Sequence, residues 1–563
     1  MPKATVRRAG NPWTLFVLFF FIIGITLIAR HCYPNPFVVQ QSRNQYWRRV
    51  PVRATRGIIQ DTKGNALVIS DTIPSFAVDP SLIKSQDIET LEQLVSLDLV
   101  QRIQAAIGTN NKFMWLNRRL DEEEAKRFQD TIKAAKTRAL FQVDEPYRKY
   151  ANQALMSHVL GFCDNENKGQ AGIELQWDNT LYSPPGQKVV VRRPGSQPAS
   201  LFSSEPEHRV VTPTVTLTLD SRIQYVVEKH LFKAAIDDGA KWAAAVCMNP
   251  FTGEILAMAS WPSYDPSDRR SITSPDVLQN IVISRAYEPG STFKPIYMGI
   301  ALERGWTTTD EIFYCPARLK VADGYIRESS NSNVGMGNID TADLLIKSSN
   351  VGMAQIGLRA EKNVTYESLR ALGFGVEPDI ELPGASQGIL PYPDNWRGIT
   401  PANIAIGQGL AVTPLQLINA MAAVVNGGKL MSPYIVKEAV NSAGELVYKG
   451  EPKVMREVYT PETAEWIKSA MRRVVLEGTG RRAMTDLTDL AGKTGTAQVP
   501  EKGKYSLSRY VASFIGFWPY DDPKYLMLIV IGEPSTGRIY GGELAAPTFK
   551  SIVEEMAELE YYS

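Results

Sequence analysis

The residues best suited to chemistry begin with a serine and a lysine in the segment EPGSTFKP, residues 288–295. Its Pro-Gly turn leads into a helix-like run that ends near Arg304, with Gly305 as its stop, which predicts Ser291 at a helix N-terminus. Lys294 then shares a helix face with Ser291, and its amine can take the hydroxyl proton if burial or nearby cations keep it neutral. The helix N-terminus also stabilises negative charge on the attacked carbonyl. The segment therefore predicts a serine nucleophile with a lysine base.

A Ser-x-x-Lys pattern alone is weak evidence, because it occurs by chance roughly once or twice in a chain of this size. Ser81 and Lys84 form a second copy that no turn precedes. Further groups are needed to support the assignment of Ser291.

Two Ser-x-Asn triplets offer a second hydroxyl, which can pass the proton to a leaving group, and an amide that can hold a substrate amide. Residues 329–331 lie in a polar stretch with several glycines, whereas residues 348–350 lie between an apolar run and a helical one. We prefer the second triplet because packed elements on both sides hold it rigidly. Ser348 is then the predicted proton relay and Asn350 the predicted amide group. An ordinary turn or helix cap is the alternative for either triplet.

The third candidate is the segment AGKTGTAQ, residues 491–498. Its small residues, Gly495 among them, and its threonines suit a strand that a substrate backbone approaches closely. Lys493 offers a fixed positive charge, and the hydroxyls of Thr494 and Thr496 can hold a carboxylate. The segment predicts a substrate-binding strand.

Two further motifs carry little weight. A nucleotide-binding P-loop needs glycine at position 487, where this chain has Leu487, so the Gly-Lys-Thr triplet does not indicate a nucleotide site. Residues 384–388 match Gly-x-Ser-x-Gly, but Pro383 and the segment 389–391 do not form the strand, elbow and helix of a hydrolase nucleophile. We expect a turn there.

The elements that must position these groups are predicted to form an α/β (α+β) domain over residues 209–563. Two hairpins, around residues 249–253 and 519–523, place strands near both ends of this region, and a helix-rich middle from about 275 to 480 separates them. This order predicts an antiparallel sheet, flanked by helices, that joins distant parts of the chain. Residues 36–208 are mixed in character and end in a Pro/Gly/Ser-rich stretch that marks a domain boundary.

The composition limits the possible functions. At 563 residues the chain exceeds the roughly 250–300 residues that one hydrophobic core serves, so we expect two or three folded units. The formal charge of +1 gives no indication of a nucleic-acid partner. The 4 cysteines are far apart and the 4 histidines form no metal-binding pattern, so we expect no metal and no cofactor, and a base other than histidine.

A membrane anchor is predicted near the beginning of the chain. Residues 15–29 carry no charge, and Leu27 with Ala29 does not make the cleavage site of a signal peptide. We expect residues 13–30 to cross the membrane once. Residues 1–12 are then a cytoplasmic tail, because large domains are translocated largely regardless of flanking charges. The rest of the chain is expected outside the cytoplasm.

The three candidate motifs, Ser-x-x-Lys, Ser-x-Asn and Lys-Thr-Gly, stand in the order of the signature of penicillin-binding proteins and serine β-lactamases. Their joint occurrence is far more specific than any one of them. The resemblance extends over nearly the whole chain, and it is to class B penicillin-binding proteins of the septal, or division, type. The segments that resemble the pedestal of this class are 56–61 with Gly64, 158–162 and 172–174, and those that resemble its transpeptidase domain are 249–266, 288–295, 404–417 and 491–498.

The resemblance implies a penicilloyl-serine transferase domain on an elongated N-terminal pedestal, with peptidoglycan D,D-transpeptidase activity. Ser291 would attack the D-Ala-D-Ala carbonyl of a stem peptide, release the terminal D-Ala and pass the acyl group to an amine of a neighbouring strand. β-Lactams would acylate the same serine. The roles carried over from the family are Lys294 as base, Ser348 as proton relay, Asn350 as amide anchor, Lys493, Thr494 and Thr496 as carboxylate-binding groups, and the backbone N–H groups of Ser291 and Thr496 as oxyanion hole.

The second motif reads Ser-Ser-Asn-Val-Gly, which resembles septal and sporulation-type enzymes, since elongation-type enzymes more often have aspartate third in the triplet. We therefore expect septal cell-wall synthesis first, with a sporulation or elongation role as the alternative. Residues 62–64 and Ala151 depart from the family pattern, which concerns only pedestal contacts. The region before Arg56 is too short for a glycosyltransferase domain. The expected partners are therefore a SEDS-type polytopic glycosyltransferase and other divisome proteins, at the bacterial cytoplasmic membrane.

Two other functions are compatible with the motifs. A D,D-carboxypeptidase or a β-lactamase of the same fold shares all three and differs in letting water deacylate the intermediate. A non-catalytic divisome scaffold or β-lactam sensor would keep the fold with a vestigial serine. The predicted anchor and the long pedestal favour work on a polymer, and the intact motifs argue against a loss of activity.

Overall fold

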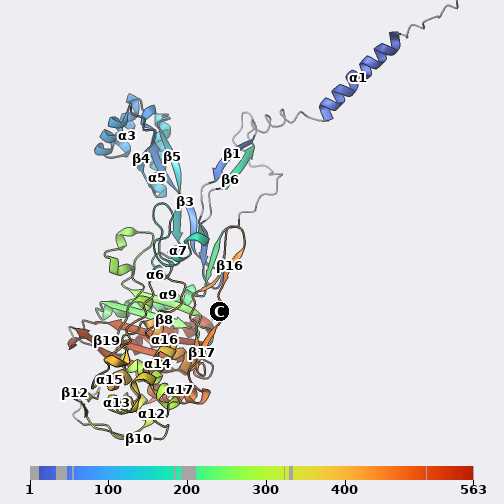
Figure 1. Cartoon of the computed structure of the whole chain (residues 1–563). Coiled ribbons are helices and arrows are strands. Elements are labelled where there is room, and N and C mark those ends of the chain that lie inside the picture. Colours follow the sequence, from blue (N-terminus) through green and yellow to red (C-terminus); the bar gives the residue numbers. More distant parts are fainter. Residues whose placement is uncertain are drawn as a thin grey trace, which may run out of the picture. The chain divides into compact units, whose positions relative to one another are not determined.

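The computed structural model describes residues 12–32, 47–52, 56–182, 186–191, 211–322, 324–328, 334–501 and 504–561 (Figure 1). The chain divides into two compact units, one formed by residues 1–55 with 184–210 and the other by residues 56–183 with 211–563. All residues predicted to do chemistry belong to the second unit.

The first unit contains a helix and a pair of strands. Helix α1 covers Pro12–Cys32, and β1 (Trp47–Val52) pairs antiparallel with β6 (Gly186–Val191). None of the helices in the described ranges combines the length and the apolar character that a bilayer crossing demands. The anchor expected over residues 13–30 therefore stays a prediction. The Pro/Gly/Ser-rich segment 192–208, predicted as a boundary, lies outside the described residues.

The second unit is built on a five-stranded antiparallel sheet with the strand order β18-β19-β20-β8-β9. The strands are β8 (Trp242–Met248), β9 (Ile255–Trp261), β18 (Ala491–Glu501), β19 (Lys504–Trp518) and β20 (Tyr525–Gly532). Both predicted hairpins are confirmed, since residues 249–254 connect β8 to β9 and residues 519–524 connect β19 to β20. The sheet joins strands from both ends of the region, as predicted, and β18 is an edge strand.

Alternate side chains of the central strands enter two different hydrophobic cores. In β20, Leu526, Leu528 and Val530 belong to one core, and Met527 and Ile529 belong to the other. This period of two residues is expected for a strand that is buried on both faces. The sheet therefore needs a cover of helices on each side.

On one face α9 (Ser221–Asp237) packs on β9, and α18 (Ala545–Tyr561) packs on α9, β19 and β20. On the other face α16 (Pro414–Val425) contacts β8 and β20, and α11 (Lys294–Glu303) and α17 (Pro461–Leu476) pack on α16. The helix-rich middle of the region is thus confirmed. Its other helices are α10 (Ile281–Ser284), α12 (Thr341–Ile346), α13 (Asn350–Arg359), α14 (Lys362–Ala371) and α15 (Thr400–Ala405).

A second sheet links the N-terminal part of this unit to the region predicted as the catalytic domain. Its strand order is β16-β15-β7-β2-β3-β4, and β5 also pairs with β3. The strands are β2 (Ile58–Gln60), β3 (Ala66–Val78), β4 (Met114–Asn117), β5 (Leu140–Tyr150), β7 (Thr214–Leu217), β15 (Val436–Val440) and β16 (Leu446–Lys449). Ile58 of β2 pairs in parallel with Thr214 of β7, so one sheet contains strands from both sides of the predicted boundary.

Three helices and the outer strands of this sheet form a small lobe with its own core, in which the rings of Phe76 and Phe128 lie 4.9 Å apart. Its helices are α3 (Ser85–Leu94), α4 (Leu97–Ala106) and α5 (Glu122–Ala135), and short helices α6 (Ser157–Leu160), α7 (Gly172–Gln176) and α8 (Asp178–Leu181) follow β5. Two-stranded pairs elsewhere are β10 (Ile312–Cys315) with β13 (Gly337–Asp340), β11 (Arg318–Val321) with β12 (Gly324–Arg327) and β14 (Lys429–Met431) with β17 (Val454–Glu457).

A buried group of charges ties the start of this unit to β5 and α7. Glu174 is fully buried and accepts hydrogen bonds from Arg56 and, over 2.8 Å, from Arg148. Arg56 also donates to Asp178 over 2.6 Å. Buried ion pairs of this kind are costly to break because the remaining charge is left without a partner. We call Arg56, Arg148 and Glu174 the buried ion group.

Candidate active site

Ser291 lies on a short 3₁₀ helix, η4 (Gly290–Phe293), which continues directly into α11, so that Ser291 precedes Lys294 by one turn. The predicted helix is confirmed, since α11 ends at Glu303 and Gly305 has φ +67°. Ser291 is half-buried, whereas Lys294 is fully buried. Ser291 is therefore partly accessible to solvent, while the amine of Lys294 is shielded from water.

Ser348 and Asn350 lie at the junction of α12 and α13. Ser349 caps α13 by accepting a hydrogen bond from the N–H of Gly352 over 3.0 Å. Just before it, Ser348 has φ +59°, the left-handed conformation that often follows the end of a helix. A residue other than glycine keeps this conformation only where its surroundings hold it, at a cost of roughly 1–3 kcal/mol. The two packed helices thus fix the position of Ser348.

Lys493 lies on the edge strand β18, which contacts η4. Its side chain is fully buried. Gly495 makes the contact possible, because a Cβ atom there would lie 2.4 Å from Ser513 Oγ and 2.9 Å from Thr292 Cγ2. The sequence suggested that small residues let a substrate approach this strand. The structure gives Gly495 a role within the protein itself, which is to let the strand lie against the segment of Ser291.

The three segments meet at the hydroxyl of Ser348. Lys493 Nζ donates a hydrogen bond to Ser348 Oγ over 2.9 Å, and Lys294 Nζ donates to the same oxygen over 3.3 Å. Lys294 Nζ also donates to Asn350 Oδ1 over 2.7 Å and to the carbonyl oxygen of Ser348 over 2.8 Å. The fold therefore brings the three predicted motifs together.

Burial changes the protonation of both amines. Burial lowers the pKa of Lys294 to about 7. The negative charge of Glu328 has the opposite, smaller effect and raises this pKa. Burial also lowers the pKa of Lys493 well below its usual value, and the charge of Lys294 lowers it further. The site thus disfavours two charged ammonium groups at once, and it provides a neutral amine near neutral pH. A neutral amine beside a serine hydroxyl can act as a general base.

The hydroxyl of Ser291 itself takes no part in this network. Among the described residues it has no hydrogen-bond partner, and Lys294 directs its donors at Ser348 and Asn350. Catalytic hydrogen bonds often tighten only in the complex with substrate, so this geometry agrees with a base one turn away. The direct Ser291 to Lys294 pair suggested by the sequence is not formed here.

The hydroxyls of the two threonines on β18 have partners within the protein. Thr494 Oγ1 lies 2.8 Å from Thr479 Oγ1, which follows α17. Thr496 Oγ1 accepts a hydrogen bond from the N–H of Gly541 over 3.1 Å. Because that oxygen acts as an acceptor, its own O–H remains able to donate to a carboxylate. The sequence held no signal for Thr479.

Sequence reasoning missed Glu328, a residue only 7% exposed that directly follows β12. Its carboxylate accepts hydrogen bonds from Ser349 Oγ over 2.6 Å and from the N–H of Asn350 over 2.8 Å. The first N–H groups of a helix lack partners within the helix, so Glu328 holds the start of α13 and with it Asn350. The one signal available in the sequence was its place as an acidic residue just before the other triplet. That triplet, 329–331, lies outside the described residues.

Two other serines considered from the sequence, Ser81 and Ser386, make local hydrogen bonds. Ser81, on η1 (Pro80–Leu82), donates its hydroxyl hydrogen to Asp79 over 2.7 Å. Ser386 accepts a hydrogen bond from the N–H of Gly388 over 3.1 Å, in a segment without a regular strand or helix, as predicted.

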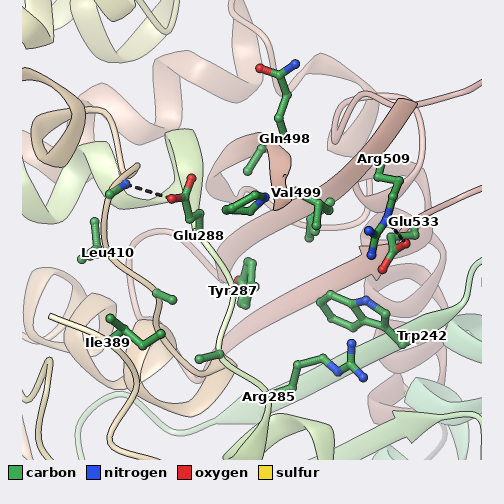
Figure 2. A pocket seen from close by; sticks show the side chains of 16 residues that line it. Trp242, Arg285, Tyr287, Glu288, Ile389, Leu410, Gln498, Val499, Arg509 and Glu533 are labelled. Carbon is green, nitrogen blue, oxygen red and sulfur yellow. Dashed lines mark hydrogen bonds and ion pairs between the residues drawn. The ribbon is translucent and has the colours of Figure 1, made fainter. Parts of the chain in front are cut away.

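A pocket of about 460 Å³ is lined in part by the segment that precedes η4 (Figure 2). Tyr287 and Glu288, which come just before η4, form part of its wall, together with Ala497 and Gln498, which follow Thr496 on β18. The pocket wall therefore includes residues that adjoin, in the sequence, the segments that hold Ser291 and Thr496.

The pocket wall carries charges of both signs (Figure 2). The guanidinium of Arg285 lies 5.1 Å from the ring of Trp242, and Arg509 pairs with Glu533 over 2.6 Å. Burial raises the pKa of Glu288 to about 7, although its carboxylate accepts a hydrogen bond from the N–H of Gly409 over 3.0 Å, which lowers the pKa. Within the described ranges, Arg285 Nε and Glu288 Oε2 are buried without a hydrogen-bond partner. The wall thus offers both a donor and an acceptor to a polar ligand.

The fold and the site together define a class of protein. A five-stranded antiparallel sheet between helices, with a serine beside its edge strand and two buried lysines around a second serine, has the features of a penicilloyl-serine transferase. Residues 243–554 match the family model of the penicillin binding protein transpeptidase domain. Residues 51–208 match that of the penicillin-binding protein dimerisation domain.

Individual relatives agree with this class. The chain is 31% identical to stage V sporulation protein D of Bacillus subtilis (strain 168), over 98% of this chain and 86% of that protein. It is also 31% identical to the probable peptidoglycan D,D-transpeptidase PenA of Neisseria gonorrhoeae, over 94% of this chain and 90% of that protein. Among solved structures it is similar to penicillin binding protein 3 of Mycobacterium tuberculosis complexed with ampicillin, with a TM-score of 0.69 and 26% identity over 91% of this chain and 96% of that chain. The chain belongs to the penicillin-binding protein transpeptidase family and is a class B member of it.

Proposed function

We propose that this class B penicillin-binding protein cross-links peptidoglycan as a D,D-transpeptidase in which Ser291 is the nucleophile. The transpeptidase activity in cell-wall synthesis follows from the family and from the names of its relatives. The assignment of residues rests on one observation. The Ser348 hydroxyl is held between two buried amines, and one of them, Lys294, lies one turn from Ser291.

In the proposed acylation step Ser291 Oγ attacks the carbonyl between the two D-Ala residues of a stem peptide. A neutral Lys294 amine takes the proton of the Ser291 hydroxyl. Ser348, which is hydrogen-bonded to that amine, delivers its own proton to the leaving D-Ala nitrogen and receives one from Lys294. The ester bond to Ser291 forms and the peptide bond breaks. The same groups act in reverse when the amine of a second stem peptide takes over the acyl group.

The substrate carboxylate is proposed to bind at Lys493 and the hydroxyls of Thr494 and Thr496. An anion at this place raises the pKa of the Lys493 amine and so restores its charge. Asn350 is proposed to hold a substrate amide through its Nδ2, which donates one hydrogen to the carbonyl of Arg327 over 2.9 Å and has a second hydrogen to offer.

The oxyanion hole is proposed to consist of the backbone N–H groups of Ser291 and Thr496. Gly495 supports this arrangement, since it lets β18 lie close to η4. One such donor is worth ~3–4 kcal/mol of transition-state stabilisation. The pocket beside Glu288 is the proposed place for the polar groups of the stem peptide further from the reacting bond.

β-Lactams are proposed to acylate Ser291 by the same route. Support comes from the solved structure of the related Mycobacterium tuberculosis protein with ampicillin. Like the substrate, these compounds carry a carboxylate and a reactive amide.

We further propose residues 36–208 as the pedestal, residues 209–563 as the transpeptidase domain and residues 13–30 as a single membrane anchor. The uncharged stretch 15–29 supports the anchor. Residues 1–12 would then be cytoplasmic and the transpeptidase domain periplasmic or extracellular. After cell lysis and an alkaline wash the full chain should stay with the membranes, and a variant without residues 1–32 should not.

In the cell we propose a septal role, with a SEDS-type glycosyltransferase and other divisome proteins as partners. The resemblance of the Ser-Ser-Asn-Val-Gly segment supports it, and the similarity to a sporulation protein keeps a sporulation role as the alternative. Depletion should produce filaments that fail to divide. Rounded cells would indicate an elongation role, and a defect confined to spore formation would indicate a sporulation role.

A purified full-length protein, given a D-Ala-D-Ala donor peptide and an amine acceptor, tests the reaction directly. We expect the aminolysis product, in amounts that rise with acceptor concentration. Hydrolysis alone under excess acceptor would identify a D,D-carboxypeptidase. Rescue of a depleted strain by Ser291→Ala would identify a non-catalytic scaffold.

A further inference from the structure

A second pocket lies in the second unit and shares no lining residue with the candidate active site. Its volume is about 180 Å³, several times the ~30 Å³ that one water molecule occupies in the liquid. Three arginines line it: Arg119 follows β4, Arg148 lies on β5, and Arg269 lies on η2 (Arg269–Ser271). The fold has therefore gathered three positive charges from distant segments around one hollow.

Buried donors of this pocket lack partners. Arg148 Nη2, Arg119 Nε and Tyr150 OH each have no hydrogen-bond partner among the described residues. Arg148 and Tyr150 are only 5% and 6% exposed. Buried polar groups in proteins are nearly always hydrogen-bonded, so these donors indicate an acceptor that this part of the chain does not supply.

Other contacts hold the three guanidinium groups in place. Arg148 belongs to the buried ion group. Arg119 donates to Asn165 Oδ1 over 3.1 Å and to the Asn165 carbonyl over 3.0 Å. Arg269 donates to the carbonyl of Cys163 over 3.2 Å. Arg148 and Arg119 are thus positioned before any ligand arrives, which lowers the entropy cost of binding, whereas Arg269 is exposed and has this single contact.

The acidic residue in the pocket wall does not neutralise these cations by direct pairing. It is Asp164, whose Oδ1 accepts the N–H groups of Glu166 over 2.9 Å and Lys168 over 3.0 Å within its own loop. Burial lowers the pKa of Arg119, Glu145 raises it, and the charge of Arg269 contributes to lowering it. A bound anion would relieve this repulsion between cations.

We propose that this pocket binds one small oxyanion group, a phosphate or a carboxylate, between Arg119, Arg148 and Arg269. The planar fork of donors on a guanidinium matches both groups. The proposal is independent of the catalytic function, because none of these residues contributes to the candidate active site.

Isothermal titration calorimetry of the full chain in detergent tests the site, with inorganic phosphate in one arm and acetate in the other. We expect saturable binding at one site per chain. The arm with the higher affinity shows whether the pocket prefers a phosphate or a carboxylate. Arg119→Gln and Arg269→Gln should each weaken binding by about tenfold or more, because each removes a charge-assisted hydrogen bond. Arg270→Gln is the matched control, since that neighbour of Arg269 is 91% exposed and does not line the pocket, and it should bind as the wild type does.

Circular dichroism and the unfolding temperature show whether each variant is folded. If a glutamine variant fails to fold, the corresponding lysine variant, Arg119→Lys or Arg269→Lys, takes its place. Lysine keeps the positive charge and lacks the planar, forked donors of the guanidinium, so it should also weaken binding. The proposal is overturned if neither anion binds saturably, or if the Arg119 and Arg269 variants bind as tightly as Arg270→Gln, which would mean that binding does not depend on the pocket.

Discussion

Lys493 Nζ donates a hydrogen bond of 2.9 Å to Ser348 Oγ, although the two residues are 145 positions apart in the sequence. The bond connects the edge strand of the five-stranded sheet to the junction of α12 and α13. Lys294, from a third segment, donates to the same oxygen. The hydroxyl of Ser348 is therefore the point at which the fold assembles the site.

Replacement of this hydroxyl should slow the chemistry. Ser348→Ala removes the proposed relay between Lys294 and the leaving nitrogen, so acylation by a fluorescent penicillin should slow by ~10²–10⁴-fold, the usual contribution of general acid–base catalysis. Stopped-flow fluorescence measures the rate. Ser386→Ala, in a surface turn, is the control and should acylate at the wild-type rate. A normal rate for Ser348→Ala would exclude it as the relay.

The acylation rate should also depend on pH. Lys294 acts as a base only without its proton, and burial lowers its pKa to about 7. The second-order rate of penicillin acylation should therefore reach a plateau above this pH and fall by about tenfold per pH unit well below it. A rate that stays constant from mildly alkaline to mildly acidic pH would rule out Lys294 as the base.

Glu328 should set the position of that pH profile. Its negative charge raises the pKa of Lys294, so Glu328→Gln should move the midpoint of the rate profile to lower pH. A loss of structure alone would lower the plateau and leave the midpoint in place. Glu377→Gln, at an exposed position, is the control. An unchanged midpoint in Glu328→Gln would show that this carboxylate positions α13 and does not tune the base.

The buried ion group should matter for stability and not for chemistry. Glu174→Gln leaves Arg56 and Arg148 buried without their shared carboxylate, which should lower the free energy of unfolding by ~3–5 kcal/mol. Thermal unfolding and the acylation rate of the folded protein measure the two effects separately. Lys233→Ala breaks an exposed ion pair and should change the unfolding temperature little. Equal stability of Glu174→Gln and the wild type would contradict this role.

Much of the site could be predicted because its motifs combine residue types with local patterns. The Pro-Gly turn and apolar run placed Ser291 at the start of a helix, and the flanking apolar runs singled out Ser348 over the triplet at 329–331. Small and β-branched residues placed Lys493 on a strand. In each case the neighbours in the sequence decide the local structure.

The remaining contacts depend on where distant segments lie after folding. Glu328 reaches the site only because β12 ends beside α13, and Thr479 only because α17 ends beside β18. The sequence around a single acidic residue or threonine has no local pattern that predicts such a contact. The arginine pocket is of the same kind, since Arg119 and Arg269 are 150 residues apart and meet only in the folded unit.

Mass spectrometry of the protein after reaction with penicillin tests the central claim most directly. We expect one penicilloyl group per chain, on the peptide that contains Ser291, and none on Ser291→Ala. A penicilloyl group on another residue of the wild type, or its retention in Ser291→Ala, would contradict the account.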